Sequence, residues 1–316
     1  MRIVVLDDYQ DVARSFGPFD RLGADVSVLH EHLGPEAVVD ALRGADVVVT
    51  MRERTPFDES LFVRLPDLRL LVTTGLVNAS IDLAAAARHG VTVCGTATAP
   101  GPARATTELT WALILAVVRH VPQEDRALRA GRWQTTVGTG LAGSTLGVAG
   151  LGRLGAQVAQ VGRAFDMDVV AWSANLTAER AAEVGARAVS KQELLTTADV
   201  LTVHLKLSDR TVGLFGADEL ALLKPTAVLV NTSRGPIVDE DALVAALHAG
   251  TLAGAGLDVY GREPLPPGSP LLSAPRTVLT PHLGYVTRQT YELMYTQIVE
   301  NIEAWRAGAP TRVMSG

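Results

Sequence analysis

Short apolar runs and amphipathic stretches alternate along the chain and predict strands and helices in turn. The runs in the first hundred residues predict five strands, at residues 3–6, 26–29, 47–50, 70–73 and 91–94. A helical pattern precedes each of the last four strands, and the pattern at 81–88 ends at His89 and Gly90, a typical helix stop. Because strands that alternate with helices are typical of parallel sheets, residues 1–98 are predicted to form one doubly wound α/β domain.

A second alternating series follows residues 99–104, where two prolines interrupt the pattern and predict a domain boundary. Helices are expected at 106–120 and 125–130. Six strands are then expected, at residues 146–149, 169–172, 200–204, 228–231, 255–259 and 278–280. Six parallel strands are enough for a dinucleotide-binding sheet. A last helical pattern at 288–306 is expected to pack on the first domain. We therefore predict one domain from 1–98 and 286–316, and a second from 99–285.

A glycine fingerprint lies between a strand and a helix that begin the second series. Gly150 permits the tight turn, Gly152 lets the backbone approach a pyrophosphate, and Gly155 allows close helix–strand packing. The free N–H groups of the first helical turn are suited to binding phosphates. The alternative, a glycine-rich turn without a ligand, does not explain why the glycines occur in this strand–turn–helix context.

The residue that distinguishes NAD from NADP is expected at the end of the next strand, near Ser173 and Asn175. An acid there would accept a hydrogen bond from the ribose 2′-hydroxyl, and an arginine would attract a 2′-phosphate. The segment contains neither. Ser173 and Asn175 can hydrogen-bond either ribose or serve as ordinary turn residues. We expect NAD or NADP as cofactor, with NAD slightly favoured.

Composition narrows the class of protein. The formal net charge of −6 over 316 residues gives no electrostatic reason to expect a nucleic-acid or membrane-surface partner. The longest apolar stretch, 109–118, is half a membrane span, and the N-terminal apolar run is too short for a signal peptide. The single cysteine, Cys94, ends a predicted strand and suits a small buried position better than a nucleophile. A cytoplasmic enzyme is therefore expected.

Three residues that each follow a predicted strand suit redox chemistry on a 2-oxo acid. They are Arg234, Glu263 and His282, and carboxyl ends of parallel strands meet at the edge where such folds bind ligands. A guanidinium can hold the substrate, an imidazole can exchange its proton, and a carboxylate can keep that imidazole charged and oriented. Each residue alone also has an ordinary structural interpretation, so the joint placement carries this hypothesis. No metal is expected.

The segments at 146–155, 200–204, 230–239, 254–264 and 280–284 together resemble the D-isomer-specific 2-hydroxyacid dehydrogenases. That family includes 3-phosphoglycerate, glyoxylate/hydroxypyruvate and formate dehydrogenases. The resemblance covers nearly the whole chain, in the short form without a regulatory domain. It implies a Rossmann NAD-binding domain inserted into a flavodoxin-like substrate domain. It also implies hydride transfer between a nicotinamide and a small D-2-hydroxy or 2-oxo acid, in a cleft between hinged domains.

The resemblance also implies roles for individual residues. Arg234 would bind the substrate, His282 would exchange the proton and Glu263 would be the partner of His282. Other cofactor contacts are implied at Arg153, Leu154, His204, Thr232, Ser233, Asp258 and Gly284, with Asp258 holding the nicotinamide carboxamide. The helix from 107 and the arm after it match the family's dimer region, so a homodimer is expected.

A loop at 74–78 matches the family segment whose backbone amides hold the substrate carboxylate, here with Leu76, Val77 and Asn78. Many members have glycine where this chain has Val77, and a branched side chain there narrows the pocket. Arg52 and Arg54, which follow the third predicted strand, are either contacts for a second substrate anion or solvated surface residues.

Two alternatives stay open. One is an NAD(H)-sensing scaffold like the transcriptional corepressors related to this family, which carry the same three residues. The other keeps the enzyme but gives it another small anion, such as formate, as substrate. Oxidation of bound NADH by a 2-oxo acid distinguishes the first alternative from the enzyme.

Overall fold

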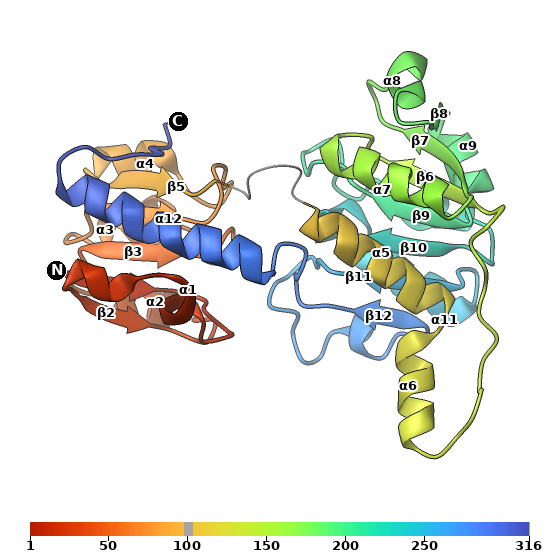
Figure 1. The fold of residues 1–316 in the computed structure, drawn as a ribbon, viewed down its shortest axis with the longest axis horizontal. Helices are drawn as coiled ribbons and strands as arrows, with labels where there is room; N and C mark the ends of the chain where they lie inside the picture. Colours follow the sequence, from red (N-terminus) through yellow and green to blue (C-terminus); the bar gives the residue numbers. More distant parts are fainter. Residues whose placement is uncertain (98–103, 316) are drawn as a thin grey trace. The chain divides into compact units, whose positions relative to one another are not determined.

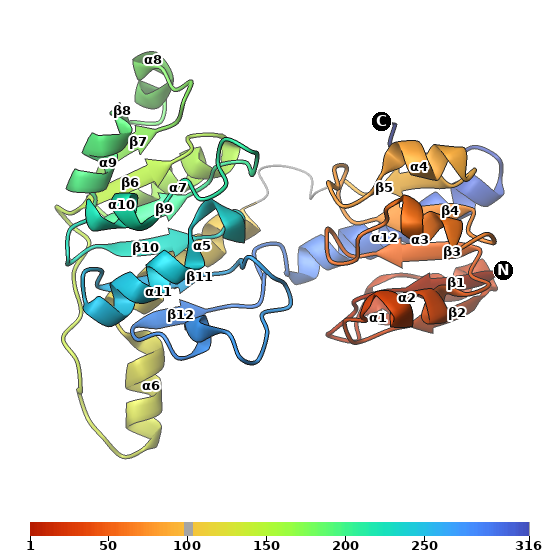
Figure 2. The same cartoon turned by 180° about the vertical axis from the view of Figure 1, so that it is seen from behind.

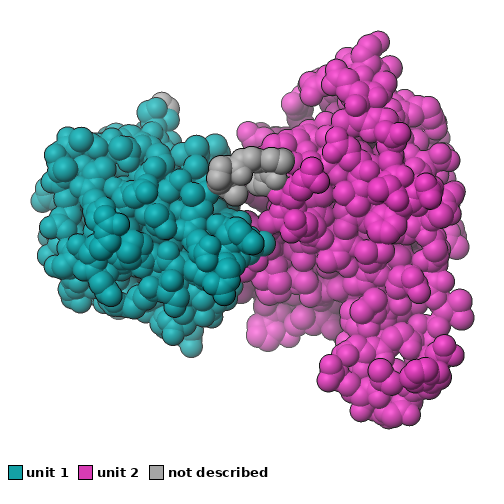
Figure 3. All heavy atoms as spheres, in the orientation of Figure 1, with its two compact units in different colours: residues 1–103, 287–316 teal, residues 104–286 magenta. Residues whose placement is uncertain are grey.

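The computed structural model describes residues 1–97 and 104–315 and divides the chain into two compact units (Figure 3). Unit 1 comprises Met1–Ala103 and Thr287–Gly316, and unit 2 comprises Arg104–Val286. Residues 99–103 of the predicted boundary segment lie outside the described residues. Each unit has its own sheet and its own buried core.

Unit 1 is built on a five-stranded parallel sheet in the order β2-β1-β3-β4-β5 (Figure 1). The strands are β1 (Arg2–Val5), β2 (Asp25–Val28), β3 (Val47–Thr50), β4 (Leu70–Thr73) and β5 (Thr92–Gly95). The β3 and β4 side chains are buried along their whole length, as expected of parallel strands covered on both faces. The strand order is that of flavodoxin-like folds, with its switch point between β1 and β3.

Helices cover both faces of this sheet (Figures 1 and 2). One face carries α2 (Pro35–Leu42), α3 (Glu59–Val63) and α4 (Leu83–Arg88). The other carries α12 (Arg288–Arg306), beside α1 (Ala13–Phe16) and the short helix η1 (Phe19–Leu22). Asn301 anchors α12 by donating its side-chain amide to the Gly95 carbonyl at 2.8 Å. The last helix of the chain is therefore part of the N-terminal unit.

Unit 2 is built on a seven-stranded parallel sheet in the order β12-β11-β10-β9-β6-β7-β8. The strands are β6 (Thr145–Ala149), β7 (Asp168–Trp172), β8 (Arg187–Ala188), β9 (Val200–Val203), β10 (Val228–Asn231), β11 (Gly254–Leu257) and β12 (Thr277–Leu279). The prediction of six strands missed β8, because two residues at a sheet edge are too short to show any hydrophobic period. The strand order reverses between β6 and β9, where doubly wound sheets bind dinucleotides.

Two layers of helices enclose this second sheet (Figures 1 and 2). On one face lie α5 (Ala105–Val118) and α7 (Arg153–Ala164), and on the other α9 (Lys191–Thr197), α10 (Ala217–Ala221) and α11 (Glu240–Ala249). The remaining elements are α6 (Val121–Arg129), α8 (Ala178–Ala182), η2 (Gly235–Ile237) and η3 (Pro270–Leu272). The predicted fold class, two doubly wound parallel sheets of Rossmann and flavodoxin type, is confirmed.

Local sequence explains where individual helices begin and end. The Asp239 carboxylate accepts the Ala242 N–H at 3.0 Å and starts α11, and Gly250 ends it in the left-handed region at φ 71°. Cys94 is buried in β5, and burial raises the pKa of its thiol to about 11, which fits the expected packing position. Within the described residues, none of the helices combines the length and the apolar character needed to cross a bilayer.

Candidate active site

The residues predicted for cofactor and substrate in unit 2 follow the carboxyl ends of its parallel strands. Gly150 to Gly155 follow β6, Ser173 and Asn175 follow β7, and His204 follows β9. Thr232 to Arg234 follow β10, Asp258 to Glu263 follow β11, and His282 follows β12. Because every strand runs in the same direction, these segments share one edge of the sheet.

The glycine turn between β6 and α7 has the geometry that a phosphate-binding turn needs. Gly150 has a φ of 97°, a conformation that favours glycine. A Cβ atom on Gly155 would lie 2.0 Å from the Gly150 carbonyl oxygen, so only glycine allows this helix–strand contact. A Cβ atom on Gly152 would meet no described atom within 4 Å, so the backbone there faces open space.

Helix α7 begins directly after Gly152, and no side chain of the described residues caps its first N–H groups. Uncapped N–H groups at a helix N-terminus attract anions. Nearby, the Nδ1 atom of the half-buried His204 is itself buried and has no hydrogen-bond partner among the described residues. Its Nε2 lies 2.9 Å from the Thr202 hydroxyl, and burial lowers the pKa of His204 to about 4. The turn and helix start fit a dinucleotide pyrophosphate.

The residues after β7 and β10 differ in how firmly they are held. Asn175 is exposed and Ser173 is half-buried in a turn whose Ser173 carbonyl accepts the Leu176 N–H at 3.1 Å. Thr232 is buried, with its hydroxyl 2.8 Å from that of Thr110 on α5. Ser233 donates its hydroxyl to the Leu205 carbonyl. These contacts hold the loop after β10 firmly, whereas the segment 173–175 after β7 contains neither an acid nor an arginine.

His282 and Glu263 form a close pair. The imidazole Nδ1 lies 2.6 Å from Glu263 Oε2, and the other carboxylate oxygen accepts the Tyr260 N–H at 3.0 Å. Burial pushes the pKa of Glu263 upward, but His282, the Tyr260 amide and the Arg234 charge together outweigh it and leave that pKa below its usual value. Glu263 is therefore ionised at neutral pH and orients the imidazole through Nδ1.

Asp258 organises the loop that carries His282. Its Oδ1 accepts the Thr280 hydroxyl at 2.6 Å and the Leu283 N–H at 2.7 Å, and its Oδ2 accepts the Gly284 N–H at 2.9 Å. Burial raises the pKa of Asp258, against the opposing effect of these donors and of the His282 charge. Because each carboxylate oxygen accepts about two hydrogen bonds, Oδ2 retains capacity for one further donor, such as a carboxamide.

Arg234 is half-buried beside this pair. Its Nη1 donates to the Ser233 carbonyl at 2.8 Å, and its own carbonyl accepts the Asn231 side-chain amide at 3.0 Å. Asn231 also accepts the Ser233 N–H at 3.0 Å, so one buried side chain fixes the whole loop after β10. The effect of Arg234 on the pKa of Glu263 places its positive charge within electrostatic reach of that carboxylate.

In unit 1, the loop after β4 presents backbone N–H groups next to a glycine with a positive φ. Gly75 has a φ of 97°, and within the described residues the amides of Leu76 and Val77 make no hydrogen bond. The residues Leu76 and Val77 are 52% and 72% exposed. Asn78 is buried instead: its side chain donates to the Arg52 carbonyl at 2.6 Å and to the Thr73 hydroxyl at 2.9 Å. Asn78 thus shapes the loop, while the two residues before it offer the free amides.

Arg52 and Arg54 occupy different positions in the loop after β3. The Arg52 backbone is left-handed at φ 52°, and its guanidinium lies against Gly75, with Nε 3.7 Å from the Glu53 carboxylate. Arg54 instead donates to the Asp7 carbonyl at 3.1 Å and stacks 4.6 Å from the centre of the Tyr9 ring. Arg52 therefore borders the loop with the free amides.

Two residues that frame the pair have no distinguishing pattern in the sequence. Thr280 holds Asp258 through its hydroxyl, and Tyr260 contacts both the Glu263 carboxylate and the Thr280 carbonyl. Their nearness in sequence to Asp258 and His282 was visible. Their contacts join β11 to β12, however, and no local pattern indicates which side chains meet across two strands.

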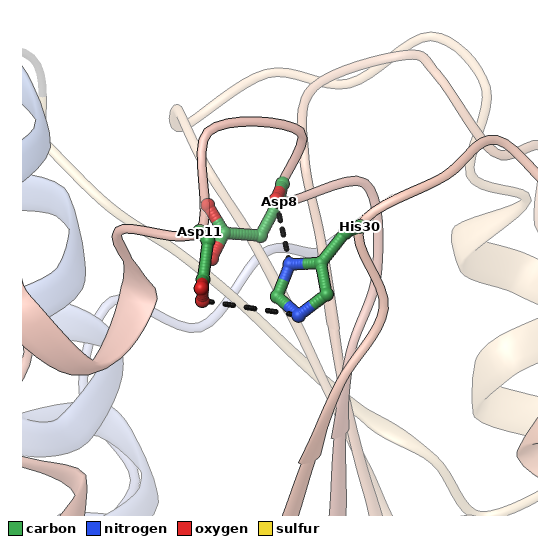
Figure 4. A group of neighbouring side chains, drawn as sticks. All are labelled: Asp8, Asp11 and His30. Carbon is green, nitrogen blue, oxygen red and sulfur yellow. Dashed lines mark hydrogen bonds and ion pairs between the residues drawn. The ribbon is translucent and has the colours of Figure 1, made fainter.

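A separate cluster in unit 1 brings Asp8, Asp11 and His30 together (Figure 4). The Asp8 carboxylate accepts the Val12 N–H and the Ala13 N–H, both at 2.9 Å, and so caps the start of α1. His30 Nδ1 lies 3.0 Å from the Asp8 carbonyl oxygen, and Nε2 lies 3.8 Å from the exposed Asp11. These contacts account for the cluster as a helix start with two solvated neighbours.

Comparison with known proteins gives consistent matches. A sequence model of the D-isomer specific 2-hydroxyacid dehydrogenase NAD binding domain matches residues 111–284. Glyoxylate reductase of Aeropyrum pernix is 39% identical over 296 residues, which cover 90% of this chain and 87% of that protein. D-3-phosphoglycerate dehydrogenase of Bacillus subtilis is 37% identical over 274 residues, covering 86% of this chain and 51% of that protein. A solved phosphoglycerate oxidoreductase of Vibrio cholerae has a TM-score of 0.92 at 39% identity, covering 98% and 100% of the two chains.

Proposed function

The chain belongs to the D-isomer-specific 2-hydroxyacid dehydrogenase family, and on that premise we propose that it interconverts a small 2-oxo acid and its D-2-hydroxy acid with NAD or NADP. The observation that carries the proposal is the 2.6 Å contact between His282 Nδ1 and Glu263, beside Arg234 and on the sheet edge that holds the glycine turn. Few other reactions require a dinucleotide site, an oriented acid–base pair and a fixed cation together.

The proposed mechanism gives each residue one task. A nicotinamide cofactor held at this site would supply the hydride in the reducing direction. Arg234 holds the substrate carboxylate or carbonyl with its fork of donors. Because Glu263 occupies Nδ1 of His282, Nε2 is the ring atom that gives the carbonyl oxygen its proton and takes it back in the reverse reaction. The free amides of Leu76 and Val77 are proposed to bind the substrate carboxylate.

The cofactor contacts follow the same logic. Gly150, Gly152 and Gly155, with the amides of Arg153 and Leu154 at the start of α7, are proposed to hold the pyrophosphate. Asp258 is proposed to hold the carboxamide through Oδ2, with Thr232, Ser233, Gly284 and His204 lining the site. Ser173 and Asn175 are compatible with either ribose, so both cofactors belong in the test.

The test is an absorbance assay of NADH and NADPH oxidation against glyoxylate, hydroxypyruvate, pyruvate, 2-oxobutyrate, phenylpyruvate and oxaloacetate. We expect turnover with at least one of these acids, and a His282→Gln variant should lower kcat by about 100-fold or more. Cofactor affinity should stay within about threefold of wild type, because no described contact joins the imidazole to the glycine turn.

Each other outcome has a definite meaning. Preserved turnover in the His282→Gln variant would contradict the acid–base role. Tight NADH binding without turnover on any acid would favour the sensing scaffold. Oxidation of formate with NAD, but no reduction of a 2-oxo acid, would favour the other small-anion enzyme.

A further inference from the structure

We propose that the Tyr260 hydroxyl positions the His282–Glu263 pair. The expected effect on catalysis rests on the proposed function, whereas the expected effect on the geometry of the pair does not. Tyr260 is buried in the loop that leads from β11 to Glu263, and its hydroxyl contacts the Leu257 carbonyl at the end of β11 and the Thr280 carbonyl just after β12. It touches the surroundings of both residues, and it is a positioning residue because none of its contacts reaches a reacting atom.

The hydroxyl acts on the His282 side. It lies 2.9 Å from the Thr280 carbonyl oxygen and 3.2 Å from the Leu257 carbonyl oxygen. The two carbonyls share its single proton, and the contact with Thr280 is the shorter one. The Thr280 carbonyl also accepts the His282 N–H at 3.0 Å. The phenol therefore fixes the carbonyl that closes the turn holding His282.

That turn needs external support. His282 has a φ of 55°, a left-handed conformation that a non-glycine residue keeps only when its surroundings determine it. Asp258 supports the turn from one side, through Thr280, Leu283 and Gly284. Tyr260 supports it from the other. Without the hydroxyl, the Thr280 carbonyl keeps, among the described residues, only the His282 N–H, and the turn is free to relax.

The backbone of Tyr260 acts on the Glu263 side. Its N–H donates to Glu263 Oε1 at 3.0 Å, which leaves Oε2 for His282 Nδ1. The next amide, of Gly261, donates to the Glu240 carboxylate on α11 and so holds the loop against that helix. Tyr260 thus positions both members of the pair: its backbone positions Glu263, and its side chain positions His282.

The Tyr260 hydroxyl keeps its proton throughout the working pH range. Burial, followed by the charges of Asp258, Glu263 and Glu240, raises the pKa of Tyr260 above its ordinary value. The other charged or titratable groups next to the pair are Arg234, which acts on Glu263, and Tyr285, whose ring packs edge-on against His282 with 5.8 Å between the ring centres. Any pH effect of removing the hydroxyl therefore reports on the pair and not on ionisation of the phenol.

A Tyr260→Phe variant tests the proposal without substrate. The proton in the 2.6 Å His282–Glu263 contact should give a far-downfield proton NMR signal, identified by its loss in His282→Gln. We expect its exchange with water to become about tenfold faster or more in Tyr260→Phe, because the looser turn opens more often. Tyr295→Phe is the matched control, since it removes a buried hydroxyl 3.3 Å from Asp8 in unit 1. It should leave the signal unchanged.

Activity gives the second test. In Tyr260→Phe we expect kcat to fall about tenfold, with cofactor Kd within about twofold of wild type and the alkaline limb of the reduction rate at lower pH. 3-Fluorotyrosine placed at position 260 keeps the hydroxyl and should restore the exchange rate and kcat, which separates hydroxyl loss from misfolding. An unchanged proton signal in folded Tyr260→Phe would overturn the proposal. If wild type reduces no 2-oxo acid, the proposed function fails, while the NMR result still decides the role of Tyr260.

Discussion

At the scale of single residues, three of the nine described non-glycine residues with left-handed backbone lie just after strands, at the carboxyl edges of the sheets. Asp7 follows β1 at φ 58°, Arg52 follows β3 at φ 52°, and His282 follows β12 at φ 55°. Such conformations cost about 1–3 kcal/mol each and persist where surrounding contacts hold them. At His282 these contacts come from Asp258, Tyr260 and Glu263. The conformation lowers the stability of the fold there but holds the imidazole in a fixed position.

The Glu263–His282 pair leads to a prediction for pH dependence. In Glu263→Gln the imidazole loses its counter-ion, and the charged form that donates the proton becomes less favourable. The alkaline fall of the 2-oxo acid reduction rate should therefore move to lower pH, by about one unit. The measurement is a pH–rate profile at saturating cofactor.

The matched control is Glu59→Gln. Glu59 lies 2.7 Å from His89 in an exposed pair of unit 1, so its loss should leave the profile unmoved. Because folding lowers the pKa of Glu263, the ionised Glu263 carboxylate stabilises the folded protein. This stabilisation is present above the pKa that Glu263 has in the unfolded chain, and it is lost as pH falls through the pKa that Glu263 has in the folded protein. An alkaline limb that stays in place in Glu263→Gln would show that the two groups are not coupled.

At the scale of elements, glycines in the β6–α7 turn serve two different purposes. Gly155 lets α7 pack onto the turn, since a Cβ atom there would lie 2.0 Å from the Gly150 carbonyl oxygen. Gly152 has no such packing role among the described residues, because its Cβ position is open. The open position is explained if a pyrophosphate approaches the backbone there.

Two alanine variants test this separation. Gly155→Ala should destabilise the fold by about 1–3 kcal/mol, because helix and turn must move apart. Gly152→Ala should cost only about 0.5–1 kcal/mol, the loss of a favourable N-cap residue, yet weaken NADH binding by about tenfold or more. Urea unfolding and a fluorescence titration with NADH measure the two effects. Wild-type NADH affinity in Gly152→Ala would contradict the proposed pyrophosphate contact.

At the scale of the whole molecule, the chain forms two units, and the first is completed by the last helix of the chain. In unit 2, α6 and the segment after it project from the body of the unit (Figure 1). This arm carries the residues Trp133 and Val137, which are 76% and 93% exposed. Large apolar side chains exposed on a projecting segment are typical of a surface that another protein covers. We propose that a second copy of the chain covers the arm.

Sedimentation equilibrium tests the homodimer. The wild-type protein should have twice the mass of one chain at micromolar concentration, and a Trp133→Glu, Val137→Glu double variant should shift to the mass of one chain. Val212→Glu is the control, because Val212 is 58% exposed in the same unit but lies outside the arm. A wild-type protein that sediments as a single chain would exclude the proposed dimer.

The sequence by itself determined the fold class and the order of the chemical groups along the chain. Hydrophobic periodicity is a local property, so it revealed eleven of the twelve strands in the described part of the chain and missed only the two residues of β8. Because parallel strands end at one edge, alternation with helices also indicated that Arg234, Glu263 and His282 follow strands of the same sheet edge. Their catalytic roles stay predictions.

Only the tertiary structure decided which groups touch. It brought His282 Nδ1 to Glu263, Thr280 to Asp258 and the Tyr260 hydroxyl to Thr280, and it attached α12 to unit 1 through Asn301 and Gly95. These contacts join residues that are 19 to 206 positions apart in sequence. Their geometry depends on strand register and side-chain packing, which the fold as a whole sets and no short segment encodes.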